Sequence, residues 1–296
     1  MMEYSQKLQS YWEERYKWLI NRGDFRGLLD SNEEEAHHRL KNQLRERKAS
    51  IIRGNIHSQT VSHFQIEERN IIDYMLWHKF LVKQDNKIYQ EERVEHRKAV
   101  FREDELISDE GVSIERDSGK PTIEDEERQK ANKEFGFSYN RLAAVKYAER
   151  WWNDYNPAYK SFDVDCTNYI SQCLRAGGAP MRGYPGRSRG WWFQNNNWSY
   201  SWSVAHAFRW HLSGSTVGLK GKEVQTPGEL QPGDVVCYDF DGDGHWQHST
   251  IVVDHDGKGM PLVNAHTTNS RMRYWAYEDS TAWTPEIKYK FFQIEG

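Results

Sequence analysis

The sequence has few cysteines and no long apolar run, and these absences exclude several classes of protein. Three cysteines among 296 residues are too few, and too odd in number, for a framework of disulfides. They form neither a Cys-x-x-Cys pair nor the Cys/His spacing of a structural zinc site. The first residues lack the basic-then-apolar pattern of a signal peptide, and no apolar run approaches the length of a membrane span. We therefore expect a cytoplasmic protein by default, although release from spores or by lysis leaves no mark in a sequence.

An excess of positive charge is also lacking. The net charge is -4 and the isoelectric point is about 6.3, which gives no electrostatic case for binding nucleic acid. The apolar content is only 37%, but the 13 tryptophans can supply a core because large aromatic side chains bury much area per residue. We expect no membrane partner, no cofactor and no metal. The run from Asp239 to Gly244 resembles the start of a calcium-binding loop, but its twelfth position is Thr250, so a plain turn is favoured.

The first part of the chain, residues 1–108, is predicted to be a small α+β domain of helices followed by a three-stranded meander. Apolar residues recur with a helical period in residues 3–30 and at four-residue steps in residues 33–49. Alternating patterns typical of strands follow at 60–66, 74–81 and 88–102. This part carries no catalytic motif, so we expect it to pack or to position the rest.

An acidic linker is predicted at residues 109–136, and it could contain a short helix near residues 124–133. The second domain then spans residues 137–296. Helical patterns begin at Leu142, Cys166 and Ser201. They are followed by short apolar strands at 235–240, 248–254, 261–266 and 288–294.

Cys166 is the candidate nucleophile. It follows Asp165 and opens an apolar-periodic segment that ends at Gly177-Gly178, so it is predicted to lie in the first turn of a helix. Unpaired N–H groups and the helix dipole at this end stabilise a thiolate. Asp165 is expected to cap the helix. The alternative is that Cys166 is a buried small hydrophobic residue, as most free cysteines are.

The strands offer partners for Cys166. His248 opens an apolar strand directly after a loop, a position that suits a general base because it is rigid and still reachable. Asn264 and His266 lie on one face of the following strand by the period of two. Either side chain could orient the far nitrogen of His248, and the sequence leaves both open.

Several separated segments together resemble one known family. They are FDVDCTNYISQCLRAGGAPM, GWWFQNNNWSYSWSVA, LQPGDVVCYDFDGDGHWQHSTIVV and PLVNAHTTN. In this order they are similar to the amidase domain of the NlpC/P60-type, papain-like superfamily, a type common in bacilli. The resemblance covers about residues 137–294. It implies an α+β papain-like fold, a catalytic cysteine at Cys166, a catalytic histidine at His248, and a variable third polar residue at Asn264 or His266.

The resemblance also implies a hydrolase that cuts an amide or peptide bond, with peptidoglycan stem peptide as a candidate substrate. The candidate substrate-binding residues are Asp165, Trp191, Trp192 and Trp202. The indole rings could stack on a sugar or a peptide. The alternative is that the tryptophans form a hydrophobic lid over the core. Two other functions stay open. The domain could be a catalytically inactive binding module, or the same thioester could be intercepted by an amine, which would make the enzyme an acyl transferase.

Overall fold

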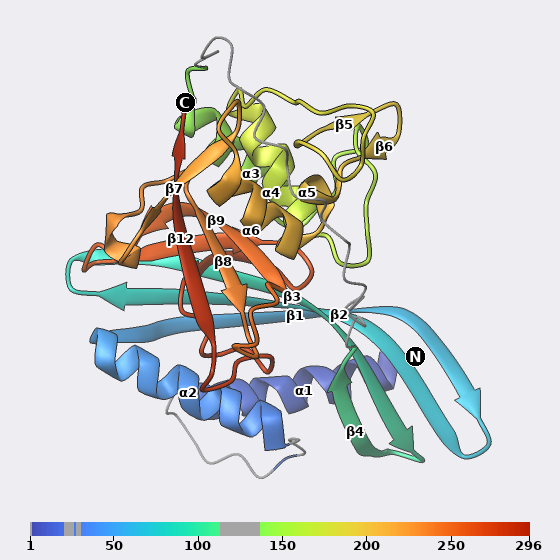
Figure 1. Cartoon of the computed structure of the whole chain (residues 1–296). Coiled ribbons are helices and arrows are strands. Elements are labelled where there is room, and N and C mark those ends of the chain that lie inside the picture. Colours follow the sequence, from blue (N-terminus) through green and yellow to red (C-terminus); the bar gives the residue numbers. More distant parts are fainter. Residues whose placement is uncertain (1, 21–26, 28–30, 113–136) are drawn as a thin grey trace. The chain divides into compact units, whose positions relative to one another are not determined.

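The computed structural model describes residues 2–20, 27, 31–112 and 137–296 and shows an α+β protein with antiparallel strand pairs (Figure 1). The chain forms two compact units. The first contains the described residues up to 112 together with Thr268–Trp283, and the second contains those from 137 to 267 together with Thr284–Gly296. The division expected from the sequence, at 1–108, 109–136 and 137–296, stays a prediction. Most of the expected linker, including its short helix, lies outside the described residues.

The first unit contains the two predicted helices and the three predicted strands, and two further strands. Its helices are α1 (Met2–Leu19) and α2 (Ser31–Arg47). Its strands are β1 (Ala49–Ile66), β2 (Arg69–Gln84), β3 (Lys87–Arg102), β4 (Glu105–Gly111) and β11 (Asn269–Tyr274). The strand order is β1-β2-β3-β11, and β4 pairs with the end of β3.

The alternating pattern predicted a strand at residues 60–66, but strand β1 begins much earlier, at Ala49. Its first half contains Gly54 and Asn55, which have low strand propensity, but the strand pairs continuously with β2 apart from two register shifts. Strands β4 and β11 were not predicted at all. The expected linker included the end of β4, yet residues 105–111 pair with Arg97–Arg102 of β3. Pairing with a long neighbour thus overrides weak local preference.

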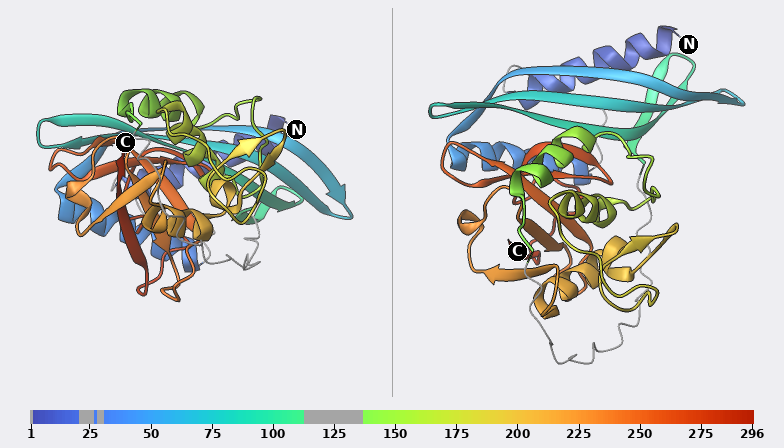
Figure 2. Two further views of the ribbon diagram at one scale, coloured as in Figure 1. Left: turned by 45° about the horizontal axis from the view of Figure 1, so that its top comes forward. Right: turned by 90° about the horizontal axis from the view of Figure 1, so that it is seen from above.

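An apolar cluster holds α1 on one face of the sheet (Figure 2). Leu8 and Trp12 of α1 pack with Ile72, Tyr74 and Leu76 of β2 and with Ala99 and Phe101 of β3. Further along the same face of β3, four alternate residues are charged: Glu91, Arg93, Glu95 and Arg97. The charged residues of β3 are therefore flanked by apolar residues on both sides, by this cluster on one side and by the buried Val82 and Tyr89 on the other.

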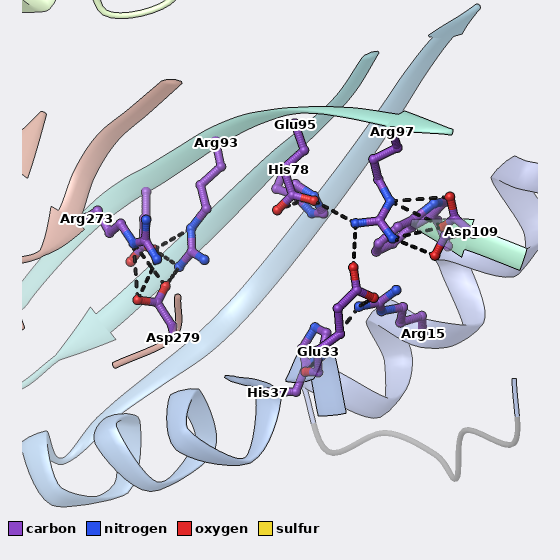
Figure 3. Close-up of polar contacts among 12 residues, drawn as sticks. Arg15, Glu33, His37, His78, Arg93, Glu95, Arg97, Asp109, Arg273 and Asp279 are labelled. Atoms are coloured by element: carbon purple, nitrogen blue, oxygen red, sulfur yellow. Dashed lines mark hydrogen bonds and ion pairs between the residues drawn. The ribbon is translucent and has the colours of Figure 1, made fainter. Parts of the chain in front are cut away.

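The ionic part is a network of paired side chains (Figure 3). Arg97 contacts three carboxylates, those of Glu33 at 2.8 Å, Glu95 at 3.1 Å and Asp109 at 3.3 Å. Arg15 reaches the other oxygen of Glu33 at 2.7 Å. Figure 3 also shows a separate group in which Asp279 lies between Arg93 and Arg273.

The second unit consists of helices on a small antiparallel sheet. The helices are α3 (Arg141–Trp151), α4 (Cys166–Ala176), α5 (Tyr200–Ser203) and α6 (Ala205–Gly214). The sheet order is β10-β9-β8-β12-β7, with β7 at Lys220–Val224, β8 at Val235–Asp239, β9 at His248–His255, β10 at Pro261–Ala265 and β12 at Lys288–Glu295. Helices α3, α4 and α6 pack against β9 (Figure 1).

The predicted helices and the four predicted strands of this unit are confirmed within a few residues, apart from one break. The segment after Ser199 forms two helices rather than one, because Val204 adopts an extended conformation (φ -114°, ψ 120°) between them. Strand β7, a one-turn 3-10 helix at Pro227–Glu229, and the two-residue strands β5 (Phe193–Gln194) and β6 (Asn197–Trp198) were not predicted. Within the described residues, no helix combines the length and the apolar character that a membrane crossing requires.

Candidate active site

Cys166 is the first residue of α4, as the sequence predicted. The helix starts at the carbonyl of Asp165, which accepts from the Tyr169 N–H at 2.9 Å, and it ends at the C-cap residue Gly177. Residues 166–174 are all buried, and the Cys166 side chain is 2% exposed. The thiol thus lies at the positive end of a helix that is enclosed by protein over most of its length.

The carboxylate of Asp165 does not cap the helix in the predicted way. Its side chain accepts no hydrogen bond from a backbone N–H of the first turn. Instead, Oδ1 accepts from the Phe162 N–H and from the Asn168 side-chain amide, both at 2.9 Å. The ψ of 0° at Asp165 differs from the extended value that is usual for a capping residue. Asp165 therefore ties α4 to the segment before it.

His266 binds the other oxygen of Asp165. Its Nδ1 lies 2.8 Å from Oδ2 of Asp165, and its Nε2 lies 2.6 Å from the carbonyl oxygen of Trp151. Both ring nitrogens of His266 thus lie within hydrogen-bond distance of an oxygen atom. The ring also stacks on Tyr169 at a centroid distance of 4.0 Å. His266 is thereby fully engaged with α3 and α4, and both of its nitrogens are used.

His248 is the first residue of β9, again as predicted, and is 8% exposed. It pairs with Tyr238 of β8, and the two rings lie 5.5 Å apart. Strand β10 runs antiparallel to β9 with Asn264 opposite Ile251, so the residues after Asn264 run back toward His248. Among them, Thr267 accepts a hydrogen bond through Oγ1 from the Asp165 N–H at 3.2 Å. The start of α4 and the end of β10 therefore meet on the side of β9 where His248 lies.

Asn264, the other candidate for the orienting residue, is fully buried in β10. Its amide nitrogen donates to Oε1 of Glu149 in α3 at 2.9 Å. Asn264 and His266 thus both link β10 to the helices. The assignment of either as the residue that orients His248 stays a prediction.

Cys173 and Cys237 are buried, as Cys166 is. Complete burial raises the pKa of Cys173 well above its usual value. Burial also raises the pKa of Cys237 to about 12, and the nearby Cys166 adds to that shift. Cys237 pairs with Ser249, the neighbour of His248, so Cys166 lies close to this part of β8 and β9. The two interior thiols stay protonated at neutral pH and serve as internal comparisons for Cys166.

The predicted substrate-binding tryptophans lie inside the protein. Trp191, Trp192 and Trp202 are 1%, 1% and 0% exposed. Their indole N–H groups donate within the chain, that of Trp202 to Oδ1 of Asn168 at 2.8 Å and that of Trp191 to Oγ of Ser171 at 2.9 Å. These bonds attach the segment before α6 to α4. Substrate binding by these rings, and by Asp165 at 1% exposure, stays a prediction that requires the surrounding loops to open.

The accessible edge of the aromatic cluster is formed by Tyr159 and Phe193. Tyr159 stacks on Trp202 at 5.8 Å, and both Tyr159 and Phe193 line a cavity of about 470 Å³. Lys160, which also lines the cavity, and Arg187 lie over the ring of Trp198 at 5.4 and 5.1 Å. The carbonyl of Lys160 accepts from the side chain of Asn168 at 2.9 Å. The wall of the cavity is thus attached to the first turn of α4.

Carboxylates of the Asp-rich run between β8 and β9 accept hydrogen bonds from backbone N–H groups of the same run. Across residues 2–20, 27, 31–112 and 137–296, no three His, Cys, Asp or Glu side chains are placed to hold a metal ion. Asp239 instead accepts from the N–H of Gly244, and Asp243 accepts from the N–H of His245. The Asp-rich run between β8 and β9 is a set of turns stabilised by its own carboxylates.

Two features of the site were not recognised in the sequence. Asn168 and Ser171 lie three residues apart in α4, and both bind Trp202, Asn168 through the indole N–H and Ser171 through the carbonyl. Polar residues in an otherwise buried helix are the available signal, since buried polar side chains are normally hydrogen-bonded. The ion pair between Asp165 and His266 joins residues 101 positions apart, and no local pattern predicts it.

The comparisons with known proteins identify the family to which the second unit is similar. The family model described as "Putative amidase domain" matches residues 138–292, which includes α3, α4 and strands β7 to β11. The chain therefore belongs to this amidase-domain family.

A protein of Bacillus subtilis (strain 168), the uncharacterized protein YhbB, is 45% identical to the chain over 295 residues. That match covers 97% of this chain and 94% of YhbB. The uncharacterized protein YjcM of the same organism is 34% identical over 140 residues, which cover 44% of this chain and 31% of YjcM. No solved structure matches the chain significantly.

Proposed function

We propose that the second unit is a papain-like thiol amidase that hydrolyses an amide or peptide bond. The observation that carries the proposal is the position of Cys166 as the first residue of α4, where the start of the helix is hydrogen-bonded to Thr267 beside the beginning of β9. A thiol at a helix N-terminus, a histidine on an adjacent strand and a membership in the amidase-domain family together fit this class.

In the proposed reaction, His248 accepts the proton of Cys166, and the thiolate attacks the amide carbonyl carbon. The carbonyl oxygen takes up the negative charge, for which the Cys166 N–H at the helix end is a suitable donor. The C–N bond breaks as His248 returns its proton to the leaving amine, which leaves a thioester on Cys166. Water, deprotonated by His248, then attacks the thioester and releases the carboxylic acid and the thiol.

The remaining polar residues hold the nucleophile in place in this proposal. His266 binds the side chain of Asp165, and Asp165 in turn fixes the segment that leads into Cys166. Asn264 is attached to Glu149 and supports the same helices. Positioning of this kind matters because a nucleophile displaced by about 1 Å can lose about 100-fold in rate.

We propose a cell-wall peptide as the substrate, with Tyr159 and Phe193 as the surface that the substrate contacts. The exposed cations Lys160 and Arg187 flank these rings through their contacts with Trp198. An amide with a carboxylate nearby would complement them, as a peptidoglycan stem peptide does.

The test is the release of amines from purified peptidoglycan fragments by the full-length chain, followed by mass spectrometry of the products. We expect hydrolysis by the wild type and none by Cys166→Ala or His248→Ala. Added hydroxylamine or glycine distinguishes hydrolysis from acyl transfer, since a transferase would form the amine adduct as its main product. If the wild type cleaves no peptide or amide in a broad library, the domain is a binding module instead.

A further inference from the structure

A second cavity, of about 430 Å³, lies entirely within the first unit. It is formed by the end of α1, one face of α2 and the beginning of β1. Its size is within the range of about 300 to 1,000 Å³ that is usual for small-molecule sites. This region is outside the stretch that matches the amidase-domain family, which begins at residue 138.

The polar residues of the cavity are basic or neutral. His38, Lys41 and Arg45 project from α2 at helical spacing, and Asn42 and Ser50 add an amide and a hydroxyl. Among the residues that the structure describes, no acidic side chain lines the cavity. The remaining wall is apolar and includes Leu19, Ile20, Leu44 and Ile51.

The cations of this cavity contrast with three buried arginines of the same unit. Arg15, Arg93 and Arg97 each contact a carboxylate. Lys41 and Arg45 form no ion pair with any of the residues that the structure describes. Lys41 lies over the ring of Trp18 at 4.1 Å, and Arg45 bonds the side chain of Asn42 at 3.1 Å. Partial burial lowers the pKa of Lys41, as expected for a cation that lacks a counter-charge.

We propose that this cavity binds a small organic acid, with its anionic group at Lys41 and Arg45 and its hydrocarbon part against Leu19, Ile20 and Ile51. An anion would supply the missing counter-charge, and the amide of Asn42 and the hydroxyl of Ser50 can donate to it. The apolar wall would cover a short aliphatic or aromatic body. The chain would then carry a ligand site in its first unit that is separate from the amidase site.

The test is calorimetric titration of the full-length chain with octanoate. Octanol and inorganic phosphate serve as separate probes of the hydrocarbon part and the anionic part of the ligand. We expect one octanoate per chain, at least tenfold weaker binding in Lys41→Met, and a smaller loss in Arg45→Gln. A loss of tenfold corresponds to one charge-assisted hydrogen bond. Octanol, which has the same chain without the charge, is expected to bind at least tenfold more weakly than octanoate.

Two matched controls remove a lysine elsewhere. Lys17→Met changes an exposed residue of α1 that does not line the cavity, and Lys160→Met removes the cation beside the aromatic cavity of the second unit. Both should bind octanoate as the wild type does. Equal binding of octanol and octanoate, equal binding by Lys41→Met, no binding at millimolar octanoate, or loss in Lys160→Met would each overturn the proposal. Should Lys41→Met not fold, Arg45→Gln and Ser50→Ala provide the same comparison.

Discussion

The two units of the chain both bury polar side chains, but they use them differently. In the first unit, Arg97 is surrounded by Glu33, Glu95 and Asp109, so that charges of opposite sign satisfy one another. In the second unit, the buried polar groups Asp165, Asn168 and His266 converge on the first turn of one helix. The ionic network of the first unit joins elements of the fold, while under the proposed function the network of the second unit holds the nucleophile in place.

The comparison has an energetic side. A buried ion pair gains little over well-packed apolar residues, but removal of one partner leaves a buried charge without compensation. Loss of one charge in the first unit should therefore lower the stability of the protein. Loss of a polar group in the second unit should lower the activity first, because the groups around α4 determine where Cys166 lies.

The largest effect is expected for Cys166→Ala, which should abolish amide hydrolysis because no other side chain can form the thioester. Cys173→Ala should keep the activity, since its thiol is buried in α4 and stays protonated. Turnover of a fluorogenic amide substrate measures both. Activity in Cys166→Ala above the level of buffer would show that the thiol is not the nucleophile.

The second prediction concerns the pair between Asp165 and His266. His266→Gln should lower kcat by about 100-fold with little change in KM, because Cys166 is displaced while the substrate surface at Tyr159 is unchanged. The rate of Cys166 alkylation should fall together with kcat. A native circular dichroism spectrum shows that the variant is folded, so that neither decrease is due to unfolding. Wild-type kcat in this variant would remove His266 from the account.

The third prediction tests the ionic network. Arg97→Met should lower the free energy of unfolding by about 3 to 5 kcal/mol, because three carboxylates lose their common partner. Differential scanning calorimetry measures the change. Lys79→Met is the matched control: Lys79 pairs with Glu92 at 3.4 Å but is half exposed, so its loss should cost less than about 1 kcal/mol. Equal costs for the two variants would contradict the contrast drawn between the units.

The fourth and smallest effect is a pH dependence. Burial and the neighbouring Arg15 lower the pKa of His37 to about 3. The native residue therefore stays neutral while the unfolded chain takes up a proton below pH 6.5, so stability should fall as the pH decreases from 6.5 toward 3. The contribution is at most about 1.4 kcal/mol per pH unit. In His37→Gln, this part of the change in the free energy of unfolding with pH should be absent. Unfolding curves measured at pH 6.5, 5.5 and 4.5 give these free energies.

The sequence predicted the parts of the fold that have a strong period. Helix α4 with Cys166 at its start, and strand β9 with His248 at its start, were both placed within a residue, because apolar alternation and glycine stops mark their limits. Strands β4 and β11 were missed because their residues are polar and are held by pairing with β3. Such pairing depends on contacts distant in sequence.

The sequence predicted the places of Cys166 and His248 in the fold, but not the residues that contact the first turn of α4. The motifs indicated Cys166 and His248, but the exposure of the tryptophans could not be read from composition. Trp202 is enclosed because its N–H bonds Asn168 and its ring lies between Trp191 and Tyr159. The cap predicted at Asp165 was wrong because His266, from the end of β10, competes for its carboxylate.

The central claim is that Cys166 is a thiolate-forming nucleophile assisted by His248, and alkylation tests it most directly. The full-length chain is treated with iodoacetamide at pH 6, and the labelled cysteines are identified by peptide mass spectrometry over time. We predict that Cys166 is labelled at least tenfold faster than a free thiol, that His248→Ala removes this advantage, and that Cys173 and Cys237 stay unlabelled in the folded protein. Labelling of Cys166 no faster than a free thiol, or at the same rate in His248→Ala, would contradict the account.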